Sequence, residues 1–393
     1  MLVPKLRFKR EDGTKYPEWT ITTLKDVCDI VGGGTPSTEN ADYWNGDIQW
    51  FTPSEIGKTK YVSKSARTIS QTGFEKSSAR KLPVGTILLT SRATLGEMAI
   101  ATTECTTNQG FQSLIPQSIN GEYLYYLQPI IKNYCYKKAC GSTFNEISKG
   151  ELGKCKISIP CLEEQQKIAD FLSAVDEVIT QSEAEVQNLE QQKKAAMQKI
   201  FSQEVRFKRE DGTDYPEWEE KTLQDVSQYI TTTGTGIKSV YVGTENMQKG
   251  CAGVCFDCDD DIAVKGIQYV PDDILISNIR PYLKKAWKAD RNGICSTDVL
   301  CIRGTSEILS DFLYTVLSSD SFFEYVMQGV KGTKMPRGDK KHIMEMPVFI
   351  PCFEEQQKIA DFLSAYDEAI SYAKQELEHW KQLKKGLLQQ MFV

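Results

Sequence analysis

The sequence predicts an α+β protein built as an internal repeat. Two small mixed α/β domains should be separated by two long helices that form an antiparallel coiled coil. Residues 7–27 agree with residues 206–226 at 16 of 21 positions, and residues 159–179 agree with residues 350–370 at 18 of 21. At 393 residues the chain also exceeds what one hydrophobic core usually supports. The two halves should therefore be related by a pseudo-twofold axis.

The segments between the duplicated blocks differ in sequence but share a pattern. Short β-rich runs bounded by Gly, Pro and Ser predict a small mixed α+β domain in each half. Residues 85–101 and 272–289 both read as an apolar strand, a polar turn with an arginine, and a second strand. Arg92 and Arg280 are the counterparts in that turn. Each half should therefore have one fold with its own surface.

A long helix is predicted at each copy of the second block. Glu-Glu-Gln-Gln opens a run without Pro or Gly that lasts to about residue 203, and in the copy to Lys385. Core positions recur in it with alternating spacings of four and three over five heptads. One amphipathic helix packed on its own domain would show a similar pattern, but two copies in one register favour pairing with each other. The predicted helix-pairing residues are Ile168, Leu172, Val175, Ile179, Val186, Leu189, Ile359, Leu363, Tyr366, Ile370, Leu377 and Trp380.

Chain connectivity gives the direction of this pairing. The first helix carries the chain from the first domain to the second, so the second helix must run back antiparallel if the two are to pair. Both helices are acidic at the start and basic at the end, which agrees with antiparallel packing and also with each helix's own dipole. The predicted organisation is a first domain, a spacer helix, a second domain and a C-terminal helix, over residues 1–160, 161–205, 206–351 and 352–393.

Bulk composition indicates a cytoplasmic protein. No apolar run reaches the ~18–20 residues that span a bilayer, and the first residues lack the apolar core of a signal peptide. Twelve cysteines without a secretory signal should be free thiols. The net charge of −6 weakly opposes nucleic-acid binding, yet residues 28–158 carry 14 Lys and Arg against 11 Asp and Glu.

Catalytic motifs are missing from the sequence, so we expect a non-catalytic protein. There is no [DNS]-P-P-[YFW] methyltransferase motif and no P-loop, and two histidines are too few for a multi-histidine metal site. Cys251, Cys255 and Cys258 could hold zinc if Cys295 or Cys301 supplied a fourth ligand. Free thiols are the alternative that we favour, and we predict no metal.

Basic residues with polar and aromatic neighbours are the remaining surface signal. Lys and Arg contact phosphates, whereas Arg, Asn and Gln can also make bidentate contacts to base edges. In the first half the candidates are Lys58, Lys60, Arg67, Arg80, Lys81, Arg92, Asn108, Gln109, Ser142, Thr143 and Asn145. In the second half they are Arg280, Tyr282, Lys284, Lys285, Lys331, Lys334, Arg337 and Lys340.

The whole arrangement resembles the specificity subunit of type I restriction-modification systems. The most specific parts of the resemblance are IPCLEEQQKIADFLSA and its copy IPCFEEQQKIADFLSA, with GGGTPST, TSRATLGE and TTNQGFQSLIP in the first half. The resemblance implies that each variable domain is a target-recognition domain that reads one half of a split DNA sequence. It also implies that the helices set the distance between the halves and dock two modification subunits.

Further partners follow from the same resemblance. The modification subunits would hold S-adenosylmethionine, so this chain should carry no cofactor of its own, and motor-nuclease subunits could join the complex. An alternative of another class stays open at this stage, namely a coiled-coil scaffold that joins two protein-binding domains and binds no DNA. The salt dependence of binding to duplex DNA would separate the two functions.

Overall fold

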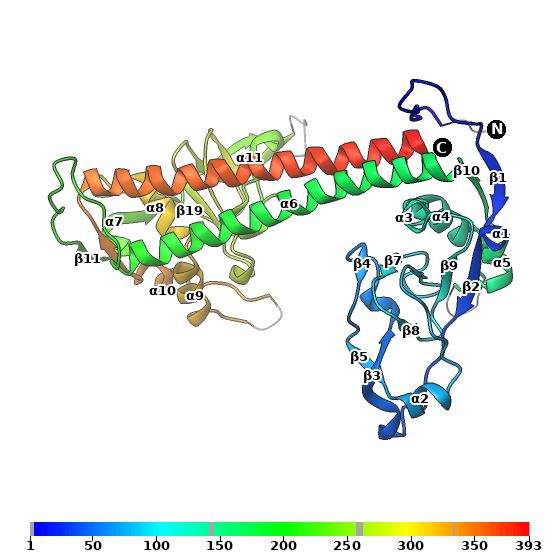
Figure 1. Cartoon of the computed structure of the whole chain (residues 1–393). Helices are drawn as coiled ribbons and strands as arrows, with labels where there is room; N and C mark the ends of the chain where they lie inside the picture. Colours follow the sequence, from blue (N-terminus) through cyan, green and yellow to red (C-terminus); the bar gives the residue numbers. More distant parts are fainter. Residues whose placement is uncertain (1–3, 141–144, 257–261, 333–334, 393) are drawn as a thin grey trace. The chain divides into compact units, whose positions relative to one another are not determined.

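The chain folds into two compact units in the computed structural model. One unit contains residues 1–183 and 376–393, and the other contains residues 184–375. Each unit therefore includes the beginning of one long helix and the end of the other (Figure 1). The structure describes residues 4–140, 145–256, 262–332 and 335–392.

The first unit is a mixed α/β domain. Its strands are β1 (Thr20–Thr23), β2 (Cys28–Gly32), β3 (Trp44–Phe51), β4 (Tyr61–Val62), β5 (Arg67–Ile69), β6 (Ile87–Leu89), β7 (Met98–Ala101), β8 (Cys105–Thr107), β9 (Gln112–Pro116) and β10 (Lys156–Ile159). Its helices are α1 (Leu24–Val27), α2 (Gln71–Glu75), α3 (Gly121–Tyr126), α4 (Gln128–Lys138), α5 (Lys149–Gly153) and the start of α6 (Leu162–Phe201), with 3-10 turns η1 (Ala41–Tyr43) and η2 (Pro53–Glu55).

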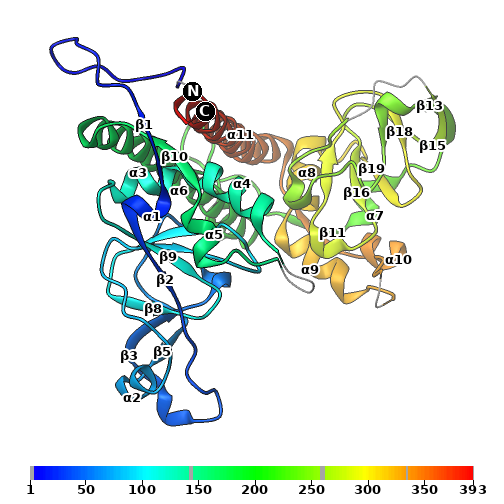
Figure 2. The ribbon, with the colours of Figure 1, turned by 90° about the vertical axis from the view of Figure 1, so that its right-hand side faces the viewer.

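These strands form two sheets and one separate ladder. The sheets have the orders β2-β9-β6-β7-β4 and β5-β3-β8, and β1 pairs antiparallel with β10. Helices α3 to α5 lie at the end of the domain near α6, while β3, β5 and α2 lie at the opposite end (Figures 1 and 2). The small sheet is therefore the part of this unit farthest from its helix pair.

The second unit has the same general plan with different strands. Its strands are β11 (Glu219–Thr222), β12 (Ser227–Tyr229), β13 (Thr233–Ile237), β14 (Tyr241–Val242), β15 (Ala263–Tyr269), β16 (Ile274–Ser277), β17 (Ala286–Lys288), β18 (Gly293–Cys295), β19 (Val299–Gly304) and β20 (Pro347–Ile350). Its helices are α7 (Leu223–Val226), α8 (Ser310–Leu317), α9 (Asp320–Gln328), α10 (Lys340–Met344) and the start of α11 (Phe353–Met391), with 3-10 turns η3 (Lys238–Val240), η4 (Lys249–Cys251) and η5 (Pro281–Leu283).

The strand pairing of the second unit mirrors the first where the sequence pattern is shared. Its sheets have the orders β12-β19-β16-β17 and β13-β15-β18-β14, and β11 pairs with β20 as β1 does with β10. The predicted strand–turn–strand pattern is confirmed in both halves, since β6 pairs antiparallel with β7 and β16 with β17. Arg92 and Arg280 both lie in the connecting turn.

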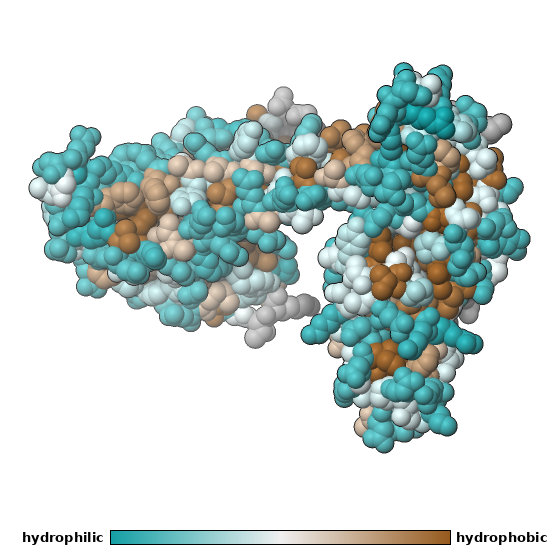
Figure 3. Space-filling model, in the orientation of Figure 1, coloured by the Kyte–Doolittle hydropathy of each residue, from teal (hydrophilic) through white to brown (hydrophobic). Residues whose placement is uncertain are grey.

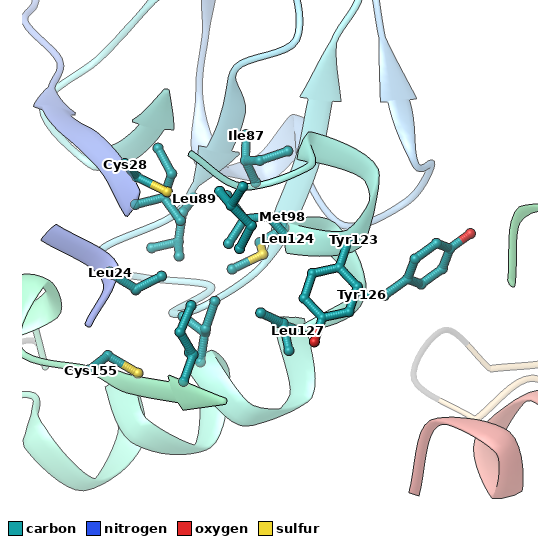
Figure 4. Packing of buried hydrophobic residues seen from close by; sticks show 14 of the residues in the cluster. Leu24, Cys28, Ile87, Leu89, Met98, Tyr123, Leu124, Tyr126, Leu127 and Cys155 are labelled. Carbon is teal, nitrogen blue, oxygen red and sulfur yellow. The ribbon is translucent and has the colours of Figure 1, made fainter. Parts of the chain in front are cut away.

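The largest core cluster of the first unit combines residues of the five-stranded sheet, of the short helices and of both long helices. Leu24, Leu89 and Leu124 come from different elements, are fully buried and belong to one cluster (Figure 4). Tyr126 belongs to the same cluster but points away from its centre. The end of α11 adds Met391, so residues from distant parts of the sequence complete this core.

A buried ion pair attaches the N-terminal segment to the start of α6. The guanidinium of Arg7 donates to both oxygens of Glu164, at 3.1 and 2.8 Å, and Glu164 is fully buried. Trp19 Nε1 donates to the same carboxylate at 3.3 Å. Arg7 also donates to the carbonyl of Pro17 at 2.6 Å, and the hydrogen bond to Glu164 raises the pKa of Arg7. Four hydrogen bonds thus compensate the desolvation of one carboxylate and one guanidinium.

The second unit repeats this contact atom for atom. Arg206 donates to Glu355 at 3.3 and 2.9 Å and to the Pro216 carbonyl at 2.5 Å, and Trp218 donates to Glu355 at 3.0 Å. Glu355 is fully buried as well. We call each set, Arg7–Glu164–Trp19 and Arg206–Glu355–Trp218, a clamp. The clamps explain why these residues recur in both halves.

A glutamine next to each clamp carboxylate ties the helix to its domain. Gln165 donates to the carbonyl of Pro160 at 2.8 Å and accepts from the backbone N–H of Asn120 at 2.9 Å. In the copy, Gln356 bonds Pro351 at 2.9 Å and Leu309 at 2.8 Å in the same way. The duplicated Glu-Glu-Gln-Gln segment is therefore the joint between each domain and its helix.

Ion pairs across the two long helices show the predicted antiparallel direction in each unit. Rising residue numbers on α6 pair with falling numbers on α11, and Figure 1 shows the two helices side by side. In the first unit the pairs are Asp176–Lys384 at 2.5 Å and Glu183–Lys381 at 2.7 Å. In the second unit they are Glu190–Lys374 at 2.6 Å and Lys193–Asp367 at 2.5 Å.

The residues at the core positions of the two helices are buried or half-buried. The buried ones are Ile168, Leu172, Val175, Val186, Ile359, Leu363 and Ile370. The half-buried ones are Ile179, Leu189, Tyr366, Leu377 and Trp380. Ile168 and Leu172 also belong to the core of the first domain, and Ile359 and Leu363 to that of the second, so each helix begins as part of its domain.

The second long helix continues beyond a glycine near its end. The run without Pro or Gly stops at Lys385, and α11 continues through Gly386 to Met391. Leu387 and Leu388 pack against the core of the first unit, and Met391 is buried in it. This burial offsets the ~1 kcal/mol that a glycine costs in a helix interior. No helix within the described ranges combines the length and apolar character that crossing a membrane requires.

The clamps predict a stability loss confined to one unit. Arg7→Met leaves a buried carboxylate without its cation, and because Arg7 is partly exposed we expect a loss of about 2–3 kcal/mol in the first unit. Arg206→Met should destabilise the second unit instead. Hydrogen exchange measured segment by segment would separate the two effects. Arg10→Met is the matched control, since its pair with Glu163 is exposed at 3.6 Å and should contribute under ~1 kcal/mol.

Candidate nucleic-acid interface

Four loops of the first unit meet around the turn that contains Arg92. The N–H of Gly34 donates to Thr107 O at 2.9 Å, that of Ser91 donates to Gly110 O at 2.8 Å, and that of Ile147 donates to Ser91 O at 3.0 Å. The segments around residues 34, 91, 107–110 and 147 are thereby held by backbone bonds. A site built this way has a rigid frame under its exposed side chains.

Arg92 is half-buried in this loop cluster and has no carboxylate partner among the described residues. Its guanidinium passes close to Gly110, where an added Cβ would lie 3.4 Å from Arg92 Nε, 3.0 Å from Asn108 Oδ1 and 2.8 Å from Pro53. Glycine at 110 thus leaves room for the arginine and the asparagine to approach each other. An unpaired arginine beside an amide has the donor and acceptor types that read base edges.

The amides predicted as candidates lie in the same cluster. Asn108 Oδ1 accepts from the N–H of Gly110 at 2.8 Å, and Gln109 is exposed with its Oε1 bonded to the Thr35 hydroxyl. Asn145 is exposed two residues before Ile147, which bonds to Ser91. Ser142 and Thr143 lie outside the described residues.

The contacts of Lys60 exclude it from the candidate DNA-binding residues. Its Nζ bonds Glu122 at 2.5 Å, the Tyr126 hydroxyl at 2.9 Å and Ser173 on α6 at 2.8 Å. Only 11% of this side chain is exposed. The ammonium is therefore used to join the domain to α6, and it has no hydrogen-bonding capacity left for a phosphate.

The other basic candidates of the first unit fall into two groups. Lys81 pairs with Glu104 at 3.0 Å, so its ammonium is less available to bind a phosphate. Arg67 is exposed and lies 3.7 Å from the Trp44 ring, so its charge is positioned but unpaired. Lys58 and Arg80 are exposed and have no ion-pair partner in the described part of the chain.

The second unit gathers its candidates around Arg280. The N–H of Arg280 donates to Pro336 O at 2.8 Å, and Lys331 and Arg337 exchange backbone bonds of 3.0 Å each. The guanidinium of Arg337 pairs with Asp298 at 3.0 Å, whose backbone carbonyl accepts from Asn278. Arg280 itself is exposed without an ion-pair partner among the described residues.

Several lysines of this unit are engaged within the fold. Lys284 bonds Asp320, Lys331 bonds Asp339, and Lys285 donates to Thr244 O at 2.8 Å. Burial, together with the positive charge of Lys249 and Arg280, lowers the pKa of Lys285. Lys340 and Tyr282 remain exposed, the latter at 52%, and Lys334 lies outside the described residues.

Both arginine turns contain a residue in the left-handed region of backbone space. Ala93 has φ 60°, and Arg280 itself has φ 53°. Such conformations cost about 1 kcal/mol or more for residues other than glycine and concentrate at functional sites. The backbone of the two turns is therefore held in an unfavourable conformation, which indicates a role in binding.

The same loops contain buried side-chain oxygens that have no hydrogen-bond partner in the described structure. The residues that carry them are not among the candidates predicted from the sequence. Ser91 Oγ, Thr107 Oγ1 and Asn278 Oδ1 are buried without a hydrogen bond in the described structure. Ser91 precedes Arg92, Thr107 precedes Asn108, and Asn278 lies two residues before Arg280. Buried polar atoms are rarely left unpaired. Polar residues inside an otherwise apolar strand run, as in TILLTSR, were the signal that could have found them.

Among the described residues, no group of three or more His, Cys, Asp or Glu side chains is placed to hold a metal ion. Cys251 Sγ donates to Lys284 O at 3.4 Å and packs against the second core, where burial raises its pKa to about 11. Cys255 is exposed, and Cys258 lies outside the described residues. Cys251 is thus placed as a packed thiol.

Comparison with known proteins identifies the family. The family model described as "Type I restriction modification DNA specificity domain" matches residues 16–191 and 259–381. The chain belongs to this family. It is 30% identical to the type I restriction enzyme MjaIX specificity subunit of Methanocaldococcus jannaschii, over 97% of this chain and 94% of that protein. It is 31% identical to the EcoR124I/EcoR124II specificity subunit of Escherichia coli over 40% of this chain and 41% of that protein.

Solved structures show the same fold. The S subunit of a type I restriction-modification system from M. genitalium aligns with a TM-score of 0.60 at 17% identity, over 100% of this chain and 99% of that chain. A chain from a structural study of type I complex assembly and conformational transition aligns with a TM-score of 0.59 at 17% identity, over 96% of this chain and 98% of that one. This chain is thus a DNA specificity subunit, the non-catalytic member of its complex, which decides against the protein-scaffold alternative.

The two unpaired arginines predict separate effects on DNA recognition. Arg92→Ala should weaken binding by ~1–3 kcal/mol and relax specificity in one half of the target, and Arg280→Ala should do so in the other half, because each projects from a different domain. Binding to libraries of duplex DNA in the assembled complex would measure this. Lys81→Ala is the control, since Lys81 is already paired with Glu104. Equal weakening at both halves would assign the arginines to phosphate contacts.

Proposed function

We propose that each domain reads one half of a bipartite DNA target, and that the duplicated frame binds two copies of one modification subunit. The observation that carries the proposal is the contrast between the two kinds of segment. The clamps and glutamine joints repeat with nearly the same distances, while the loops around Arg92 and Arg280 use different residues. Repeated surfaces suit identical partners, and different loops suit different half-sites.

Exposed apolar side chains on the frame support the docking of two partners. Phe171 and Phe362 occupy equivalent positions on α6 and α11 and are 38% and 39% exposed. Each packs edge-on against a second phenylalanine, Phe8 or Phe207, with ring centroids 5.6 Å apart in both units. Hydrophilic residues cover most of the face in Figure 3, with apolar residues in small groups. An apolar surface kept in both halves is a reasonable anchor for a protein partner.

Chemistry in the complex is supplied by the partners in this proposal. The modification subunits would hold S-adenosylmethionine, whose methyl group is transferred to adenine, and motor-nuclease subunits could join to cut unmodified DNA. The residues of this chain bind the duplex and position it. The function thus divides between a reading subunit and catalytic subunits.

Reconstitution tests the proposal as a whole. The purified chain with S-adenosylmethionine and duplex DNA should transfer no methyl groups, and addition of the modification subunit should give methylation at one split sequence. Radiolabelled methyl incorporation and mapping of the modified adenines would measure both. Methyl transfer by the chain alone, or sequence-independent transfer by the complex, would contradict it.

The repeated phenylalanine predicts a change in stoichiometry. Phe171→Ser and Phe362→Ser should each reduce the number of bound modification subunits from two to one, and the double variant should bind none, because each site loses its apolar anchor. Native mass spectrometry would count the subunits. Tyr372→Ser is the matched control, because Tyr372 is 71% exposed on α11 and its counterpart on α6 is Gln181. Loss of both subunits from a single variant would contradict two equivalent sites.

A further inference from the structure

The four ion pairs across α6 and α11 are of two kinds when the internal repeat is taken into account. Positions on α6 correspond to positions 191 residues later on α11. Asp176 corresponds to Asp367, and Lys193 to Lys384, so the pairs Asp176–Lys384 and Lys193–Asp367 are symmetric copies. Each helix contributes one acid and one base to them. These two pairs would form equally well between two copies of α6.

The other two pairs break the symmetry. Glu183 corresponds to Lys374, and Glu190 corresponds to Lys381. The pairs Glu183–Lys381 and Glu190–Lys374, at 2.7 and 2.6 Å, therefore place both acids on α6 and both bases on α11. The duplicated helices differ in the sign of charge at these positions, although the clamp residues and three of the six predicted seam positions are identical in both copies.

The reversed charges matter for which helices can pair. In an antiparallel pair of two α6 helices with the same register, Glu183 of one would face Glu190 of the other, twice. In a pair of two α11 helices, Lys374 would face Lys381, twice. Charges that flank an apolar seam select partners through attraction in the wanted pair and repulsion in the unwanted one. The side chains are 43–48% exposed, so each contact is modest and sensitive to salt.

We propose that Glu183, Glu190, Lys374 and Lys381 make the α6 seam accept α11 and reject the α6 of a second copy of this chain. The apolar seam is only partly duplicated, since Val175, Val186 and Leu189 correspond to Tyr366, Leu377 and Trp380, so the four charges add a repulsion between like helices to any selection made by the shape of the seam. The discrimination ensures that one helix pair joins one first domain with one second domain. Pairing of two α6 helices would join two first domains instead. This inference goes beyond the proposed function and does not depend on the docking of modification subunits.

The energetic part is tested in the intact chain. Lys374→Glu with Lys381→Glu reproduces the charges of an α6–α6 pair, and Glu183→Lys with Glu190→Lys those of an α11–α11 pair. In both double variants, hydrogen exchange of the segments around 183–190 and 374–381 should accelerate roughly 3- to 30-fold relative to the wild type. This acceleration should be smaller at high salt. Combining all four changes restores opposite charges and should restore wild-type exchange. Wild-type exchange in the two double variants, or fast exchange in the fourfold variant, would overturn the proposal.

Partner selection is tested with the double variant Glu183→Lys/Lys381→Glu. It keeps both intramolecular ion pairs but gives each helix one acid and one base at these positions, so self-pairing becomes complementary. Two differently tagged full-length chains refolded together should form several-fold more mixed assembly than the wild type. Lys193→Asp/Asp367→Lys is the matched control, because it also keeps its ion pair but makes α6 more uniformly acidic, and it should form no more mixed assembly than the wild type. Equal fractions of mixed assembly in all three proteins would overturn the proposal.

Discussion

The buried contact between Arg7 and Glu164, repeated by Arg206 and Glu355, is the constraint from which the rest of the architecture follows. A carboxylate with no solvent exposure is tolerable only when its charge is compensated by nearby donors. The clamp brings together the segment that enters the domain and the helix that leaves it. Each long helix therefore starts at a fixed point of its own domain.

The contrast between fixed joints and variable loops explains how one fold can read two different sequences. Backbone hydrogen bonds hold the arginine turns in place, and side chains on them are free to differ between the halves. Several of the other basic candidates are engaged with carboxylates or hydroxyls of their own unit, as Lys60 is with Tyr126. The number of cations available to DNA is therefore smaller than the composition indicates, and Arg92 and Arg280 stand out because they lack an ion pair in the described structure and also lie in equivalent turns of the two units.

The repeat made the architecture predictable from sequence, since two copies of one segment had to form two copies of one structure. The strand pairs around Arg92 and Arg280 were also predictable, from alternation and turn residues. The partners of individual lysines were not, because they depend on neighbours distant in sequence, as with Lys60 and Ser173. Burial of Met391 in the core of the first unit helps α11 to continue past a glycine, whose local preference opposes a helix.

The end of α11 has a consequence for how the chain matures on the ribosome. Phe392 lies 5.5 Å from the ring of Tyr123, and the backbone N–H of Lys5 donates to Gln390 O at 2.9 Å. Contacts separated by most of the chain length form late, because their loop-closure entropy must be met first. The first domain is translated early but lacks the helical turns of residues 376–391 until the second domain has been synthesised. During that interval its uncovered apolar surface would be open to chaperones and to neighbouring nascent chains.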